Sequence, residues 1–237
     1  MLGLGNNFSR GGVLSAGLVN TYSLSFDGTD DLVVIPNDSS IISTSALTVS
    51  AWIYADDLDS NLAILGRLNG HKAGNESDIG ILANGSVVVQ IVVDSTLRTL
   101  TSTAGDVSAT TWHHVAIQAE SGNQKIYVDN TVVATATTSG ALGTGVEDIM
   151  IGKGYISGWS FFDGNIDEVA IFDAVVSIGD LRDGSKPADL TGMSNLQGWW
   201  RFEEGSGTSA TDSSDNSNTG TFTSAPASVS YTHLTLP

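Results

Sequence analysis

The chain has 237 residues, a formal net charge of −17 and no cysteine. This length is compatible with a single large β-sandwich, and the lack of cysteine excludes disulfides and thiolate zinc sites. Because 26 acidic residues stand against 9 basic ones, the surface should repel phosphate backbones, so nucleic acid is not an expected partner. Calcium or an uncharged polar ligand suits such a surface better.

Residues 1–20 are rich in glycine and show no periodicity, which predicts a flexible arm. The first residues lack the basic and apolar regions of a Sec-type signal peptide. A protein that acts outside the cell would then be released by another route, such as lysis. No apolar run reaches the ~18 residues of a membrane-spanning helix, so insertion into a membrane is not expected.

Short runs of alternating apolar residues begin at Tyr22 and predict strands along the rest of the chain. In residues 47–54, Leu47 and Ile53 should face one way and Trp52 the other. The predicted strands are residues 22–26, 32–35, 47–54, 63–65, 79–82, 87–93, 97–101, 112–119, 125–128, 131–135, 149–151, 166–172 and 198–202. This pattern indicates an all-β sandwich in one domain, residues 21–223.

Turn and helix signals separate these strands. Asn84-Gly85 and Asp129-Asn130 predict type I′ hairpin turns. The sequence SIGD, which starts at Ser177, resembles a capping box, and with Gly184 as its end it predicts a helix of about two turns. Residues 224–237 are interpreted as an irregular tail, of which residues 230–237 do not continue the preceding polar pattern and suit an assembly or cloning artefact.

Eight segments in order carry a family resemblance. They are LSFDGTDDLVVI (24–35), LTVSAWI (47–53), TWHHVA (111–116), IYVDN (126–130), IMIG (149–152), FDGNIDEVAIF (162–172), WWRFEEGSG (199–207) and DSS (212–214). This series resembles the laminin G-like, concanavalin A-like lectin/glucanase jelly roll, in its pentraxin-like subgroup, over residues 22–222. The resemblance implies a β-sandwich of two antiparallel sheets packed face to face, with one short helix near the C-terminus.

Aromatic and histidine residues on these strands have plain structural interpretations. Trp52, Trp112 and Tyr127 are expected to fill the layer between the sheets. His113 and His114 are adjacent on one strand, so they should point to opposite faces and cannot hold one metal together. A structural, hydrogen-bonded role is therefore favoured for both histidines.

The sequence predicts no catalytic residue. Glycosidases of this fold need two carboxylates on one face, but no Glu-x-Asp-x-Glu or Glu-x-Asp-x-x-Glu string occurs. The adjacent pairs Asp167-Glu168 and Glu203-Glu204 should point to opposite faces. There is no Gly-x-Ser-x-Gly elbow, Walker loop or His-Glu-x-x-His motif. A Ser/His/Asp triad assembled from distant positions stays open.

Three candidate ligand sites follow. Asn75, Glu76 and Asp78 resemble the first half of the pentraxin calcium site, although Lys153-Gly154-Tyr155 stands where its second half is expected, and a solvated acidic loop is the alternative. A structural calcium ion is predicted at one set of residues: Asp27, Asp163, Asn165 and Asp167. Turn-forming aspartates without an ion are equally compatible. Tyr155 and Trp159 offer flat faces for a sugar ring, unless Trp159 caps the core.

The favoured hypothesis is a non-catalytic adhesion or assembly module of a virion, as a phage capsid decoration or tail protein, or of an extracellular surface. Its partner would be a glycan or another virion or surface protein. The first alternative is a calcium-dependent carbohydrate-binding module. The second is a glycoside hydrolase of the concanavalin A-like fold.

Overall fold

The structure is a computed structural model that describes residues 18–37, 40, 41, 43, 45–66, 77–143, 147–155, 158–224 and 226–230. The predicted arm up to residue 17, the ligand candidates Asn75 and Glu76, and the last seven residues lie outside the described residues. No described helix is long and apolar enough to cross a membrane.

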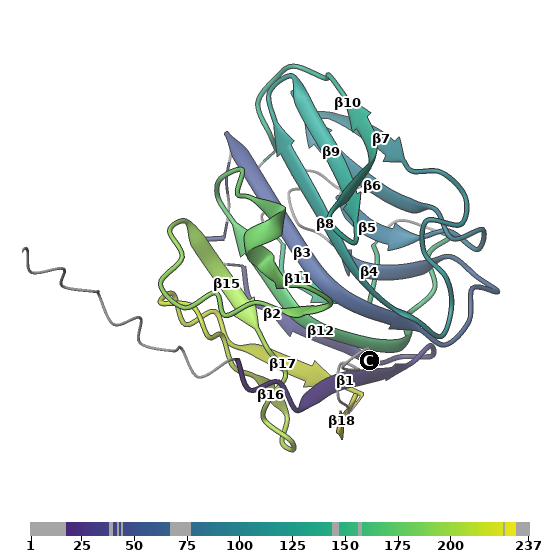
Figure 1. The fold of residues 1–237 in the computed structure, drawn as a ribbon, viewed down its shortest axis with the longest axis vertical. Coiled ribbons are helices and arrows are strands. Elements are labelled where there is room, and N and C mark those ends of the chain that lie inside the picture. Colours follow the sequence, from purple (N-terminus) through teal and green to yellow (C-terminus); the bar gives the residue numbers. More distant parts are fainter. Residues whose placement is uncertain are drawn as a thin grey trace, which may run out of the picture.

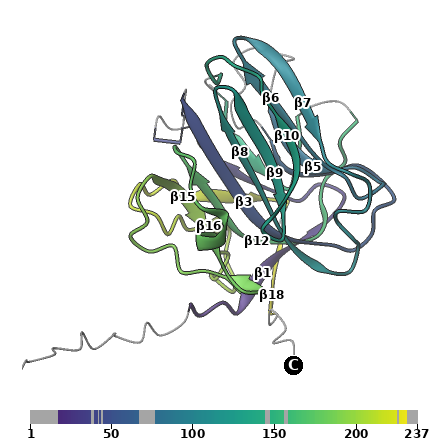
Figure 2. The same cartoon turned by 45° about the horizontal axis from the view of Figure 1, so that its top comes forward.

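Two large antiparallel sheets form the two layers of the molecule (Figures 1 and 2). In sheet I the strands run in the order β10 (Thr131–Ala136), β9 (Asn123–Val128), β8 (Trp112–Glu120), β3 (Ala46–Ala55), β12 (Asp163–Phe172), β1 (Tyr22–Asp27) and β18 (Ala227–Ser230), and β15 (Leu196–Trp200) also pairs with β12. In sheet II the order is β16 (Ser209–Ala210), β17 (Gly220–Thr223), β2 (Leu32–Ile35), β11 (Ile149–Ile151), β4 (Leu62–Gly66), β5 (Asp78–Ile81), β6 (Val87–Val93) and β7 (Thr96–Thr101). This architecture confirms the predicted β-sandwich.

The main core lies between the two sheets and follows strand alternation. On β3, Leu47 and Ile53 are buried in this core, as the sequence predicts, and Leu24 on β1 and Ile166 on β12 join them. Facing apolar side chains from two pleated sheets interdigitate in this way in sandwiches. Their removal from water is the main stabilising contribution to the fold.

Trp52, Trp112 and Tyr127 do not fill this layer, so that expectation is wrong. Each one alternates with inward-facing neighbours, such as Ile53 beside Trp52, and therefore lies on the outer face of sheet I. Trp52 is buried there, whereas Trp112 and Tyr127 are half-buried. The tryptophan that reaches the core between the sheets is Trp200.

A second, smaller core covers part of the outer face of sheet I. Its members are Ala116, Ala170, Phe172, Ile178, Leu181, Leu190 and Trp199. The predicted helix contributes only one 3₁₀ turn, η1 (Ile178–Leu181), in which Ser177 makes no capping hydrogen bond. Side chains three residues apart share one face of such a turn. One turn is therefore enough to bury both Ile178 and Leu181, and β13 (Arg182–Asp183), which pairs with β14 (Lys186–Pro187), follows at once.

The two predicted hairpin turns have different outcomes. Asp129 and Asn130 have φ angles of 49° and 67°, which confirms the type I′ turn. Between β5 and β6 only Gly85 has a positive φ, of 79°, and the Leu82 N–H donates to the Ser86 carbonyl. This is a three-residue loop instead of the predicted type I′ turn. The Asn84 carboxamide explains the change, because it accepts a hydrogen bond from the Ser86 N–H at 3.0 Å.

The C-terminal segment completes the sandwich. Strand β15 pairs with β12, which also pairs with β1, so β15 and β1 belong to the same sheet. Residues 227–230, expected to belong to an irregular tail, form β18 and pair with β1, so that expectation is wrong for these four residues. Without β18, the backbone polar groups on that side of β1 would have no strand partner.

Candidate functional site

The loop that follows β11 crosses the outer face of sheet II and presents Tyr155. This side chain is 45% exposed and is the one aromatic among the exposed large apolar side chains of the described residues. Trp159 is half-buried beside Gly80 of β5, where a Cβ atom would lie 2.3 Å from the indole ring. Only glycine leaves room for the indole there, so the site combines a fixed tryptophan with an exposed tyrosine.

Asp78 of β5 holds the backbone of this loop at Tyr155. It is fully buried, and its carboxylate accepts a hydrogen bond from the Tyr155 backbone N–H at 3.0 Å. Gly66 and Gly154 lie close around it, since a Cβ atom on either would come within about 3.1 Å of a carboxylate oxygen. The predicted ligand residues Asp78, Tyr155 and Trp159 are therefore brought together, but Asp78 positions the loop and does not face solvent.

An acidic rim lies where β1 ends and β12 begins. Its members are Asp27, Asp30, Asp31, Asp56, Asp57 and Asp163. Carboxylate oxygens of Asp27, Asp30 and Asp31 lie within 4.8 Å of one another, and Asp27 is paired in register with Asp163. Burial and then the charges of Asp56, Asp57 and Asp27 raise the pKa of Asp163. Burial and the charge of Asp27 also raise the pKa of Asp31, so the rim is a region of mutual repulsion.

The rim has oxygen donors of the kind that calcium takes. Some of these oxygens already hold the backbone, because Asp27 accepts hydrogen bonds from the N–H groups of Thr29 and Asp30, at 2.9 and 3.3 Å. Asp31 accepts one from the Asp27 N–H at 3.1 Å. The turn-forming role is therefore present, and the other carboxylate oxygens of the rim are the atoms that could hold an ion.

The four residues predicted to hold one ion do not form a single set. Asp163 and Asn165 lie on the same face of β12, at the rim end of the strand. Asp167 is four residues beyond Asp163, which corresponds to about 13 Å along an extended strand. It belongs to a different cluster, and Asp30 and Asp31 take its place beside Asp27.

Asp167 and Glu168 point to the same side of sheet I, which corrects the prediction that they face opposite ways. A β-bulge in the pairing with β3 falls between Asp167 and Ala170, and Glu168 has a φ of 49°. A bulge turns one residue out of alternation. The Asn20 amide donates to both carboxylates, at 2.9 Å to Asp167 and 2.8 Å to Glu168.

Both carboxyl groups of this pair are buried. The Trp199 indole N–H donates to Glu168 at 2.5 Å. Burial and then the charge of Asp167 raise the pKa of Glu168, while Arg201, 3.4 Å away, opposes the shift. Glycosidase carboxylates must flank a bond in an open cleft, so the pair has the surroundings of a structural element.

The neighbouring acids Glu203 and Glu204 also hold backbone. Glu203 accepts hydrogen bonds from the N–H groups of Thr21 and Tyr22, at 2.8 and 2.9 Å. Glu204 accepts one from the Thr211 N–H at 2.6 Å.

The sequence analysis missed Asn20, which donates to Asp167 and Glu168. These contacts join residues 147 and 148 positions apart in the chain, and no local pattern marks them.

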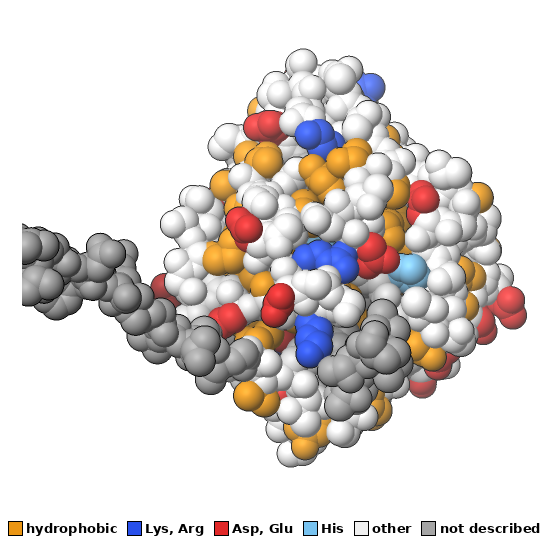
Figure 3. All heavy atoms as spheres, in the orientation of Figure 1, with side chains coloured by type: hydrophobic (Ala, Val, Ile, Leu, Met, Phe, Trp, Pro, Cys, Tyr) orange, Lys and Arg blue, Asp and Glu red, His pale blue; other side chains and the backbone are white. Residues whose placement is uncertain are grey.

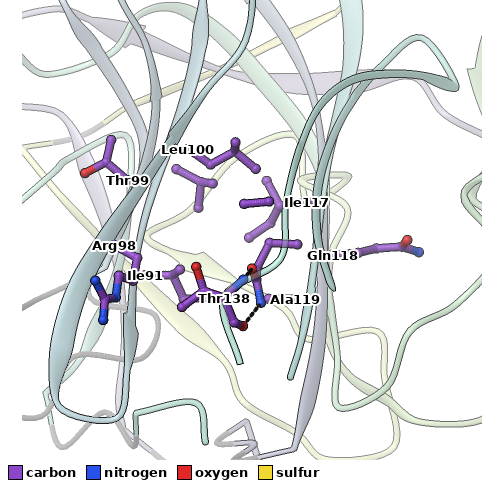
Figure 4. A pocket seen from close by; sticks show the side chains of 11 residues that line it. Ile91, Arg98, Thr99, Leu100, Ile117, Gln118, Ala119 and Thr138 are labelled. Atoms are coloured by element: carbon purple, nitrogen blue, oxygen red, sulfur yellow. Dashed lines mark hydrogen bonds between the residues drawn. The ribbon is translucent and has the colours of Figure 1, made fainter. Parts of the chain in front are cut away.

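A cavity between the sheets lies near the open end formed by β7 and β10 (Figure 4). In Figure 4, Leu100 and Ile117 point into it from the two sheets, while Gln118 points away. Its volume of about 20 Å³ leaves room for about one water molecule. This cavity is a packing gap and too small for a sugar.

Two antiparallel sheets packed face to face define a β-sandwich. A family model described as the concanavalin A-like lectin/glucanases superfamily, of laminin G type, matches residues 27–181. This is more than half of the chain, and the chain belongs to that family. No match was found among curated proteins.

Solved structures share the fold at low sequence identity. A putative carbohydrate binding protein from Bacteroides ovatus is 17% identical with a TM-score of 0.62, and the match covers 89% of this chain and 62% of that one. Domains LG4-5 of the mouse laminin α1 chain are 16% identical with a TM-score of 0.54, covering 76% and 46%. The Ruminococcus gnavus IT-sialidase CBM40, bound to α2,3-sialyllactose, is 16% identical with a TM-score of 0.51, covering 67% and 93%.

Proposed function

We propose that the chain is a glycan-binding module that does not cleave the glycan it binds, and that Tyr155 and Trp159 contact the sugar. The observation that carries this proposal is an exposed aromatic ring on a loop whose backbone is tied to a buried carboxylate. Flat aromatic faces stack on the apolar faces of sugar rings, and a backbone that is already held at Tyr155 loses less conformational entropy on binding. The carbohydrate-binding proteins among the structural neighbours support the same ligand class.

The charge of the molecule favours neutral glycans over acidic ones. With a formal net charge of −17, long-range repulsion would slow the approach of a sialylated or sulfated chain. Lys153 is the basic residue of the loop, and its ammonium lies 3.8 Å from the centre of the Phe161 ring.

A glycan array of neutral and acidic chains, with calcium and with chelator, tests this function. Tyr155→Ala should abolish binding without lowering the melting temperature, because the side chain is 45% exposed. Val132→Ala is a matched control, since Val132 has the same exposed fraction on sheet I. Retained binding by Tyr155→Ala would refute the proposed site. Loss with chelator alone would favour the calcium-dependent alternative, and release of reducing ends from glucans would favour the glycoside hydrolase.

We also propose a virion or an extracellular surface as the setting, with a glycan or a neighbouring surface protein as the partner. An acidic sandwich with a sugar-binding loop suits adhesion in such a setting. Mass spectrometry of purified particles and of culture supernatant tests it, and recovery of the protein only inside cells would contradict it.

A further inference from the structure

Ser108, His113 and Asp129 form a hydrogen-bonded series at one end of sheet I. Ser108 precedes β8, His113 is the second residue of β8, and Asp129 lies in the turn between β9 and β10. The Ser108 Oγ atom is 3.0 Å from His113 Nε2. The other ring nitrogen, Nδ1, is 2.7 Å from an Asp129 carboxylate oxygen. These are the contacts of a nucleophile, a general base and an orienting carboxylate.

The hydrogen bonds define the histidine tautomer. The Ser108 backbone N–H donates to His113 Nε2 at 3.2 Å, so Nε2 is an acceptor. In the neutral ring the proton is then on Nδ1, which donates to Asp129. This is the tautomer in which a histidine can take a proton from a serine hydroxyl.

Asp129 is held in the ionised form. Burial would raise its pKa, but hydrogen bonds from His113 and from the His114 N–H, together with the charge of Arg182, lower it. The His114 N–H is 3.0 Å and the Arg182 guanidinium 3.5 Å from the same carboxylate oxygen. An ionised carboxylate at this position stabilises the imidazolium that forms when the base takes a proton.

The series is accessible at the serine and shielded at the base. Ser108 is exposed, whereas the His113 side chain is 12% exposed. In the space-filling view, a histidine side chain reaches the surface beside acidic and basic side chains (Figure 3). A substrate can therefore approach the hydroxyl from solvent while the ring keeps its orientation.

We propose that Ser108 is a nucleophile, activated by His113 and Asp129, that cleaves small or flexible acyl esters. Ser108 Oγ attacks the ester carbonyl carbon and its proton passes to His113 Nε2. The carbon–oxygen bond to the alcohol breaks, and the alcohol leaves with that proton. Water then attacks the acyl-serine, His113 takes a proton from it and returns it to Ser108, and the acid product is released. Asp129 stays ionised throughout.

This activity goes beyond the proposed glycan binding and does not depend on it, because the aromatic loop belongs to the other sheet. Its expected rate is low. Ser108 lies in solvent, so water would stabilise the oxyanion, and a single protein donor to an oxyanion contributes about 10²–10³-fold in rate. Covalent labelling of the serine is therefore a more sensitive measurement than turnover.

The test is labelling of the full chain with diisopropyl fluorophosphate, followed by peptide mass spectrometry, with hydrolysis of p-nitrophenyl acetate as a second readout. We expect a label on Ser108, loss of both signals in Ser108→Ala, and labelling slower by about 10²-fold or more in His113→Gln, the contribution of a general base. Asp129→Asn should also slow it. Ser206 is a matched exposed serine, and Ser206→Ala should behave as the parent.

Two results would overturn the proposal. One is the absence of label on Ser108 in the folded parent protein. The other is labelling of His113→Gln at the parental rate, with a circular dichroism spectrum that shows the variant is folded. A series that only supports the loop would change the melting temperature in these variants and leave Ser108 unlabelled in the parent.

Discussion

The tryptophans of this sandwich differ in where strand alternation places them. Trp200 is fully buried in the core between the sheets, and Trp112 is half-buried on the outer face of sheet I beside Tyr54, with ring centres 5.7 Å apart. Trp200→Ala should lower the free energy of unfolding by about 3–5 kcal/mol, as for other buried large aromatics. Trp112→Ala should cost about 1–2 kcal/mol, because part of its surface is already in water.

Urea denaturation of both variants measures the difference, with Trp112→Phe as the conservative control. Equal losses in the two alanine variants would contradict the assignment of Trp112 to the outer face.

His114 couples the stability of the fold to pH. It is buried against Trp52, with ring centres 5.2 Å apart. Burial, and then the charge of Arg182, lower its pKa to about 3 from 6.5. Between these two pKa values His114 is protonated in the unfolded chain and neutral in the folded chain. The free energy of unfolding therefore decreases as pH falls from about 6.5 toward 3.

His114→Gln should lose this part of the acid sensitivity, whatever its stability at neutral pH. The measurement is the urea midpoint of parent and variant at pH 7 and at pH 5. An equal drop in both proteins would show that His114 is not the group responsible.

At the scale of elements, sequence periodicity predicted the apolar strands, including short ones such as β2 and β11, and missed the short polar strands near the C-terminus. Strands such as β3 and β6 alternate or are continuously apolar, so their burial is visible in the sequence. Strands β16, β17 and β18 consist largely of serine, threonine, glycine and alanine. Strand β17 pairs with β2, and β18 pairs with β1, while β16 pairs with β17. Pairing with strands from the start of the chain leaves no local pattern.

The candidate sites also contain residues that could be predicted from the sequence and residues that could not. Tyr155 and Trp159 could be found as aromatics in a loop, and the acidic rim as aspartates at strand ends. The bulge at Glu168 and the contact of Asn20 with the acid pair could not be found, because both depend on which strands become neighbours. The Ser108–His113–Asp129 series could only be left open for the same reason.

The segment from β15 onward is required for folding. It supplies Trp199, Trp200 and Phe202, all buried, and it supplies strand β17, which pairs with β2. Deleting residues 196–237 should therefore remove the cooperative unfolding transition. A chain that ends at Ser224 should still fold with reduced stability, since it loses only β18 and the residues on either side of it, and β18 pairs with β1 alone. A cooperative thermal transition in the longer deletion would contradict this requirement.

At the scale of the whole molecule, the candidate sites are distributed over both layers. The aromatic loop lies on the outer face of sheet II, and the Ser108 series lies at an end of sheet I. The acidic rim lies where β1 and β12 pair in sheet I and the chain turns toward β2. Because the aromatic loop lies on the other sheet, its variants can serve as controls for variants at the two sites of sheet I.

The acidic rim predicts that calcium stabilises the fold. Repulsion raises the pKa of Asp31 and of Asp163 beyond the effect of burial, and a bound cation would relieve it. An ion that binds only the folded chain raises the melting temperature by mass action. Calcium should act more strongly than magnesium, because loop oxygens tolerate long and irregular bonds better than a strict octahedron does.

Asp30→Asn is the variant that tests this site. Asp30 is exposed and its carboxylate is near those of Asp27 and Asp31, but the other two carboxylates accept the hydrogen bonds that shape the turn. Asp30→Asn should therefore reduce the rise in melting temperature at millimolar calcium and leave the fold intact. Asp215→Asn removes the same charge at another exposed position and should keep the full calcium effect, which separates binding from general screening. Identical melting curves of the parent protein in calcium and in chelator would show that these aspartates only form turns.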